Sequence, residues 1–107
     1  MELYNLNDFK LGWIIGDFIP SIIKTKNFEI AIKHYKVGQN ETKHYHKMSD
    51  EITVIISGDV KMNGLVYHAN DILYIKHEKS TDFIPLTDVI TCVIKIPSVI
   101  GDKYQNI

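Results

Sequence analysis

The stretch HYHKMSDE, residues 44–51, holds three side chains of the kind that bind metal ions. His44 and His46 are two residues apart, so in an extended strand both imidazoles point to the same side. Glu51 opens the apolar run EITVIIS, and a tight connection through residues 47–50 brings its carboxylate beside the imidazoles. Burying these groups without partners is costly, and a divalent cation that binds all three removes that cost. Short motifs of this kind also arise by chance in solvated loops, so the surrounding sequence has to decide.

The composition describes a small protein without a strong charge. The 107 residues fit one compact domain, and 12 basic and 13 acidic residues leave a net charge of -1. This balance gives no bulk attraction to nucleic acid or to an anionic membrane, and we expect neither as a partner. Every basic residue is a lysine, so the planar guanidinium fork that grips phosphate is missing, which disfavours a nucleotide site.

A cytoplasmic location is expected from the cysteine count and from the start of the chain. Cys92 is the only cysteine and cannot form an internal disulfide, which favours a reducing environment. The opening residues MELYNLNDFK lack the charged start and apolar stretch of a secretory signal. No apolar run approaches the roughly 20 residues that are needed to span a bilayer.

Most of the chain is predicted to form short strands separated by turns. The abundant isoleucines suit a pleated sheet better than a helix, and no long helical pattern appears. The region 61–67 has the pattern of a hairpin with Asn-Gly at its tip. Residues 1–27 fit a short helix or an extended edge equally well. The further strands are expected at residues 28–37, 51–57, 71–75, 82–86 and 89–96. These features predict an all-β sandwich or barrel.

The strand expected at residues 28–37 also suggests a role for a third histidine. Its alternation places Phe28, Ile30, Ile32 and His34 on one face, which we expect to be the interior. His34 is then either a hydrogen-bonded core residue or an acid or base near the metal.

The strand expected at residues 51–57 is apolar on both faces, and a barrel interior covers only one of them. Its outward side chains, Ile52, Val54 and Ile56, need cover from another part of the chain or from a second copy. We therefore expect a homodimer.

The run GQNETKHYHKMSDEITVIISG, from Gly38 to Gly58, resembles the first motif of the cupin family. That motif is a glycine, five residues, His-x-His, a short gap, a glutamate, six residues and a second glycine, and every spacing fits. The resemblance implies a single jelly-roll β-barrel domain over residues 1–107, with a core at about 28–97 and an N-terminal extension at 1–27. It also implies that His44, His46 and Glu51 hold a divalent transition metal, which is iron, manganese, nickel or zinc.

The second cupin motif is matched only loosely, by NDILYIKHEKSTDF at residues 70–83. Thr81 stands where the resemblance calls for a histidine as the fourth ligand, and a neutral hydroxyl is a poor ligand for a transition metal. Three protein ligands then leave an open position, which water, an oxygen-bearing substrate or another side chain can take.

Two classes of function remain open for such a site. The first is an enzyme whose metal acts as a Lewis acid, or activates oxygen if it is iron, on a small oxygen-rich substrate such as a sugar or a keto acid. The second is a non-catalytic module in which the metal anchors a small-molecule ligand or stabilises the barrel. An acid or base within reach of the open position, such as His34, favours the enzyme.

Overall fold

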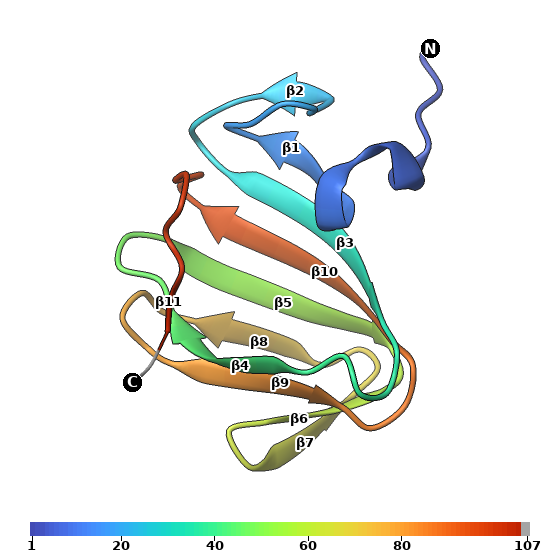
Figure 1. The fold of residues 1–107 in the computed structure, drawn as a ribbon, viewed down its shortest axis with the longest axis vertical. Coiled ribbons are helices and arrows are strands. Elements are labelled where there is room, and N and C mark those ends of the chain that lie inside the picture. The colour runs from blue at the N-terminus through green and yellow to red at the C-terminus, as the bar shows by residue number, and fades with distance from the viewer. Residues whose placement is uncertain (106–107) are drawn as a thin grey trace.

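The computed structural model describes residues 1–105 and shows two β-sheets that face each other (Figure 1). One sheet has six strands in the order β2-β1-β3-β10-β5-β8, and the other has five in the order β11-β4-β9-β6-β7. Along the chain the elements are η1 (Leu6–Asp8), η2 (Lys10–Gly12), β1 (Trp13–Gly16), β2 (Ile23–Lys24), β3 (Glu29–Tyr35), β4 (Glu41–Tyr45), β5 (Asp50–Ser57), β6 (Asp59–Met62), β7 (Leu65–His68), β8 (Ile72–Ile75), β9 (Thr81–Pro85), β10 (Val89–Ile96) and β11 (Tyr104–Gln105).

From β3 to β6, and again from β7 to β10, each connection carries the chain from one sheet to the other. Between β3 and β10, only the β6–β7 hairpin stays within one sheet. This alternation is the jelly-roll topology, so the predicted all-β jelly-roll barrel is confirmed. Within residues 1–105, no helix is long and apolar enough to cross a membrane.

Positive backbone φ angles at two of the turns explain the residues found there. The β6–β7 hairpin turns at Asn63 and Gly64, with φ of 49° and 84°, as its Asn-Gly tip predicted. Gly58 ends the first motif with φ of 88°, and an added Cβ would lie 2.1 Å from the carbonyl oxygen of Asp88. Both the angle and the close approach therefore require glycine at that turn.

The apolar core fills only part of the space between the sheets. It is built by β5, β6, β9 and β10, with Ile55, Val60, Met62, Phe83 and Val89 all 5% exposed or less. Other buried positions on the same inward faces are polar: His44, Glu51, Thr53, Thr81 and Thr91. One part of the barrel is thus an ordinary core, and another is lined by hydrogen-bonding groups.

The prediction of which face of β3 points into the barrel is wrong. Ala31 is fully buried, and Lys33 and Tyr35 line the interior with it, whereas His34 is exposed. The alternation does separate two faces, but the more apolar face points outward. Hydrophobicity alone therefore selects the wrong side in a barrel whose interior is partly polar.

The ambiguous N-terminal region contributes to the six-stranded sheet. Trp13 pairs with Ala31, so β1 extends the sheet beyond β3, and β2 extends it further. At the other end of the chain, β11 pairs with β4, Tyr104 opposite Tyr45. Figure 1 shows this C-terminal segment running beside the β4 end of the barrel. Both additions lie outside the core predicted at residues 28–97.

Candidate metal centre

The three predicted ligands lie where the chain leaves one sheet and enters the other. His44 is in β4, His46 follows the strand, and Glu51 is near the start of β5. Their exposed fractions are 6%, 4% and 8%, so all three are buried polar side chains that need partners. The connection through residues 47–49 is tight enough to bring Glu51 back against His46, as the spacing predicted.

His46 is oriented by the backbone of a distant residue. Its Nδ1 contacts the carbonyl oxygen of Asp102. A carbonyl only accepts hydrogen bonds, so Nδ1 carries a proton and Nε2 is the ring nitrogen left to bind a cation. That Nε2 lies 3.3 Å from Oε1 of Glu51 and has no hydrogen-bond partner among residues 1–105. Two acceptors facing each other in a buried site call for a positive charge between them, either a proton or a metal ion.

Glu51 keeps its negative charge despite its burial. Burial alone raises the pKa of this carboxyl, but His46, the Thr53 hydroxyl and the Lys95 ammonium more than offset it, and the pKa ends below its usual value. The Thr53 hydroxyl donates to Oε2 at 2.8 Å, which leaves Oε1 directed at His46. The site therefore contains a carboxylate, the form that binds metals.

His44 is prepared in the same way as His46. Its Nδ1 lies 2.9 Å from the Thr42 carbonyl oxygen and donates to it, so Nε2 is left as an acceptor. Burial lowers the pKa of His44, which favours the neutral ring. The two imidazole centres are 5.5 Å apart with their planes at 76°.

The chemistry of these three donors suits a divalent transition metal, but the three side chains do not converge on one point. In residues 1–105, no group of three or more histidine, cysteine, aspartate or glutamate side chains stands close enough to hold an ion. The supporting features are two imidazoles, each fixed through Nδ1 by a carbonyl, and one carboxylate. Metal-binding histidines in proteins are usually oriented in this manner.

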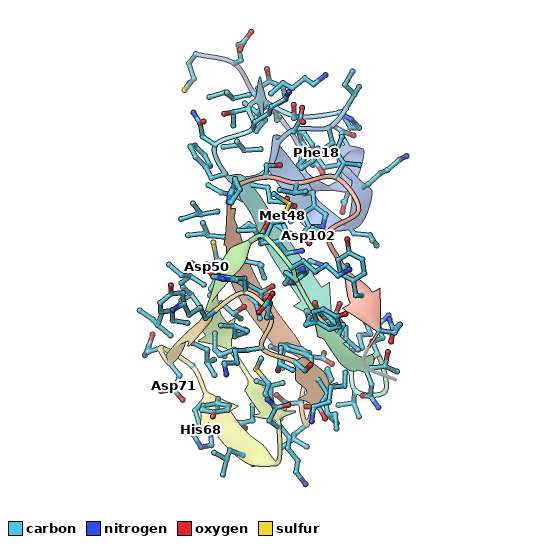
Figure 2. The ribbon with its side chains drawn as sticks, turned by 90° about the vertical axis from the view of Figure 1, so that its left-hand side faces the viewer. Phe18, Met48, Asp50, His68, Asp71 and Asp102 are labelled. Atoms are coloured by element: carbon cyan, nitrogen blue, oxygen red, sulfur yellow. The ribbon has the colours of Figure 1, made fainter. Side chains whose placement is uncertain are left out.

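Asp102 is a residue of this site that sequence reasoning missed. Its carboxylate accepts hydrogen bonds from the backbone N–H groups of Lys47, Met48 and Ser49, at 2.9, 3.1 and 2.9 Å. Figure 2 shows Asp102 beside Met48, in the loop that joins the two ligand-bearing strands. The spacing of residues in the sequence does not predict this contact, because Asp102 lies far along the chain from the first motif.

Thr81 occupies the place that the alignment of the second motif gave it. It is directly opposite His44 in the β4–β9 pairing, is 7% exposed, and lines the cavity. Its hydroxyl donates to the Asp82 carbonyl oxygen at 2.8 Å. Because a neutral hydroxyl is a poor ligand for a transition metal, Thr81 is not expected to supply a fourth ligand.

A small cavity between the sheets adjoins this centre. Its volume is about 40 Å³, and among the groups that line it are His44, Glu51, Lys33 and Tyr35. His34, the predicted acid or base, is not among them, because it lies on the outward face of β3. The titratable groups that do reach the cavity from β3 are therefore Lys33 and Tyr35, and a correct choice of the inward face would have identified them from the sequence.

Comparison with known proteins identifies the fold. No protein-family model matches the sequence, and no curated protein matches it. Among solved structures, an uncharacterized conserved protein with a double-stranded β-helix domain from Klebsiella pneumoniae matches with a TM-score of 0.68 and 21% identity, over 78% of this chain and 74% of that chain. A cupin from Bacteroides fragilis matches with a TM-score of 0.58 and 23% identity, over 68% of each chain. The DMSP lyase DddQ from Ruegeria pomeroyi matches with a TM-score of 0.69 and 13% identity, over 88% of this chain and 49% of that chain.

These similarities, together with the jelly-roll topology, show that the chain has the cupin fold. The resemblance seen in the first motif is thus confirmed at the level of the fold.

Proposed function

We propose that this protein binds a divalent transition metal through His44, His46 and Glu51 and acts on a small oxygen-rich molecule in the adjoining cavity. The observation that carries the proposal is the buried contact of 3.3 Å between Nε2 of His46 and Oε1 of Glu51. With Nδ1 of His46 held by a carbonyl, this contact joins two acceptors, and a cation between them satisfies both.

The chain's own residues define what can happen at such a site. A bound divalent metal supplies a Lewis acid for a carbonyl or hydroxyl oxygen. Thr81 is expected to supply no ligand, so a small molecule can approach the centre from that side. Tyr35 lines the same cavity, but its hydroxyl donates to Glu41 at 3.2 Å and burial raises the pKa of Tyr35, so it serves as a hydrogen-bonding group rather than as an acid.

A non-catalytic binding module is the second candidate. The observation that favours it is the exposed position of His34, since this removes the residue expected to act as acid or base. Lys33 and Tyr35 are the titratable residues of β3 that reach the cavity instead of His34. The presence of a DMSP lyase among the proteins that share the fold supports the proposal of an enzyme.

Elemental analysis of protein purified without an affinity tag tests the metal site. We expect about one transition-metal ion per chain in the wild type and almost none in His46→Ala or Glu51→Gln, since each variant removes a ligand. His34→Ala is the matched control, because it removes a histidine from the outward face and should keep full occupancy. Full occupancy in both ligand variants would refute the site.

A further inference from the structure

The cavity is lined by two ammonium groups that form no ion pair within residues 1–105. Lys33 on β3 and Lys95 on β10 each place Nζ 5.1 Å from the ring centre of Trp13. No carboxylate within residues 1–105 forms an ion pair with either lysine, and the neighbouring Glu41 is instead 3.4 Å from the Lys103 ammonium. The indole face gives weak cation–π attraction to both lysines, but it does not neutralise them.

A buried hydroxyl next to these lysines also lacks a partner. Thr91 lies directly opposite Lys33 in the β3–β10 pairing, lines the cavity, and is fully buried. Its Oγ1 has no hydrogen-bond partner in the described part of the chain. Buried hydroxyl groups in folded proteins are nearly always satisfied, and valine would fill the same volume without this cost. An unsatisfied donor facing a cavity is therefore explained by a ligand that accepts from it.

The electrostatics of Lys33 reflect the burial of its ammonium group and the charges around it. Burial is the main cause that lowers the pKa of Lys33, and the charges of Lys95 and Lys103 lower it further, against the opposing effects of Glu41 and Glu51. A negative group placed among these cations offsets both the lost hydration and the mutual repulsion.

We propose that the cavity binds the carboxylate group of a small organic acid, held by the ammonium groups of Lys33 and Lys95 and by the Thr91 hydroxyl. The inference deepens the proposed function and rests on it in one respect, since it makes this acid the molecule presented to the metal centre. Glu51, at the metal centre, lies opposite Lys95 in the β5–β10 pairing, so an acid held by Lys95 lies close to that centre.

Size and charge favour a carboxylate over a phosphate or a neutral sugar. A volume of about 40 Å³ exceeds the roughly 10–15 Å³ that one water needs, but it suits only a small ligand. Glu41 and Glu51 line the same cavity and oppose a second negative charge. The chain has no arginine to grip a phosphate, and a neutral sugar leaves both ammonium groups uncompensated.

Trp13 provides a direct readout, because it is the only tryptophan in the chain and contacts both lysines. Tryptophan fluorescence is titrated with acetate, glycolate and lactate, with glycolamide as the uncharged counterpart of glycolate and with inorganic phosphate as the competing anion. We expect a saturable response to the acids and little response to glycolamide or phosphate. Equal responses to glycolate and glycolamide, a preference for phosphate, or no saturable response to any acid would overturn the inference.

Three variants assign the binding to the named groups. Lys33→Met and Lys95→Met keep the length of the side chain and should each weaken glycolate binding about tenfold or more. Lys61→Met, at an exposed position on β6, makes the same change in net charge and should leave binding unchanged. Thr91→Val should weaken glycolate binding while raising the midpoint of thermal unfolding, since it removes an unsatisfied buried hydroxyl. Unchanged binding in the lysine variants, or an unstable Thr91→Val protein with normal binding, would refute the assignment.

The two proposals can fail separately. The titrations are repeated on metal-free protein and on protein loaded with Zn²⁺. If the protein binds stoichiometric metal but shows no fluorescence response to any acid, the carboxylate site is refuted and the metal centre is supported. A carboxylate response that depends on both lysines in protein that never takes up metal supports the carboxylate site and refutes the metal centre.

Discussion

His44 and His46 are fixed by the same device, a backbone carbonyl that accepts from Nδ1. For His44 the carbonyl belongs to Thr42, two residues earlier, and for His46 it belongs to Asp102, near the other end of the chain. In both rings Nδ1 consequently carries a proton, and Nε2 is the nitrogen left to bind a metal. The His-x-His spacing predicted the types of ligand and their shared side, but the partner of His46 arises from a tertiary contact that no local pattern encodes.

Replacing Asp102 tests how much this distant residue contributes to the site. Asp102→Asn removes the charge that receives three backbone N–H groups, and we expect a loss of about 1–3 kcal/mol of unfolding free energy, measured by urea denaturation. Metal affinity should also fall, because these side-chain contacts hold the Asp102 backbone, whose carbonyl positions His46, against the loop that carries the ligands. Asp88→Asn, at an exposed position, is the control and should change neither quantity.

The pH dependence of the same variant gives a second check. Burial alone would raise the pKa of Asp102, but the N–H groups of Ser49, Lys47 and Met48 more than offset it and lower the pKa. The stabilisation is therefore fully present above the ordinary carboxyl pKa and is lost as the pH falls through the lowered value. The wild type should lose its advantage over Asp102→Asn in acid, and a constant difference down to low pH would contradict this account.

At the level of elements, the sequence predicted the strands well and their environments less well. The strands predicted at residues 51–57 and 89–96 correspond to β5 and β10, because continuous β-branched runs bounded by turn residues admit few alternatives. The inward face of β3 was wrong because its outward isoleucines are more apolar than the lysine and tyrosine that face the cavity. The strands β1 and β11 are defined by their pairing partners, Ala31 and Tyr45 among them, and short segments of this kind carry little signal of their own.

At the level of the whole molecule, the outward face of the six-stranded sheet is broadly apolar. In the strand pairings, Ile94 lies opposite both Ile30 and Ile52, and Cys92 lies opposite both Ile32 and Val54. The row continues on β8, where Ile72 and Tyr74 are 68% and 65% exposed. A contiguous apolar surface of this kind is typical of an interaction site, and the same face of a second copy of the chain would cover it.

We therefore predict a homodimer formed through this face. Sedimentation at micromolar concentration should show a dimer for the wild type and a monomer for Val54→Lys, which places a charge at the centre of the row. Val66→Lys, on the exposed β7 of the other sheet, should remain dimeric. A monomeric wild type, or a Val54→Lys protein that is folded and still dimeric, would contradict the prediction.

The most direct test of the metal centre is nuclear magnetic resonance of the histidine ring nitrogens, recorded before and after addition of Zn²⁺. We expect Nδ1 of both His44 and His46 to carry a proton with and without metal, as their carbonyl partners require. One equivalent of Zn²⁺ should bind at Nε2 of these two rings, shift both Nε2 signals and leave His34 unchanged. Nε2 signals of His44 and His46 that do not move on addition of Zn²⁺, or shifts confined to other histidines, would show that the buried His46–Glu51 contact is not a metal site.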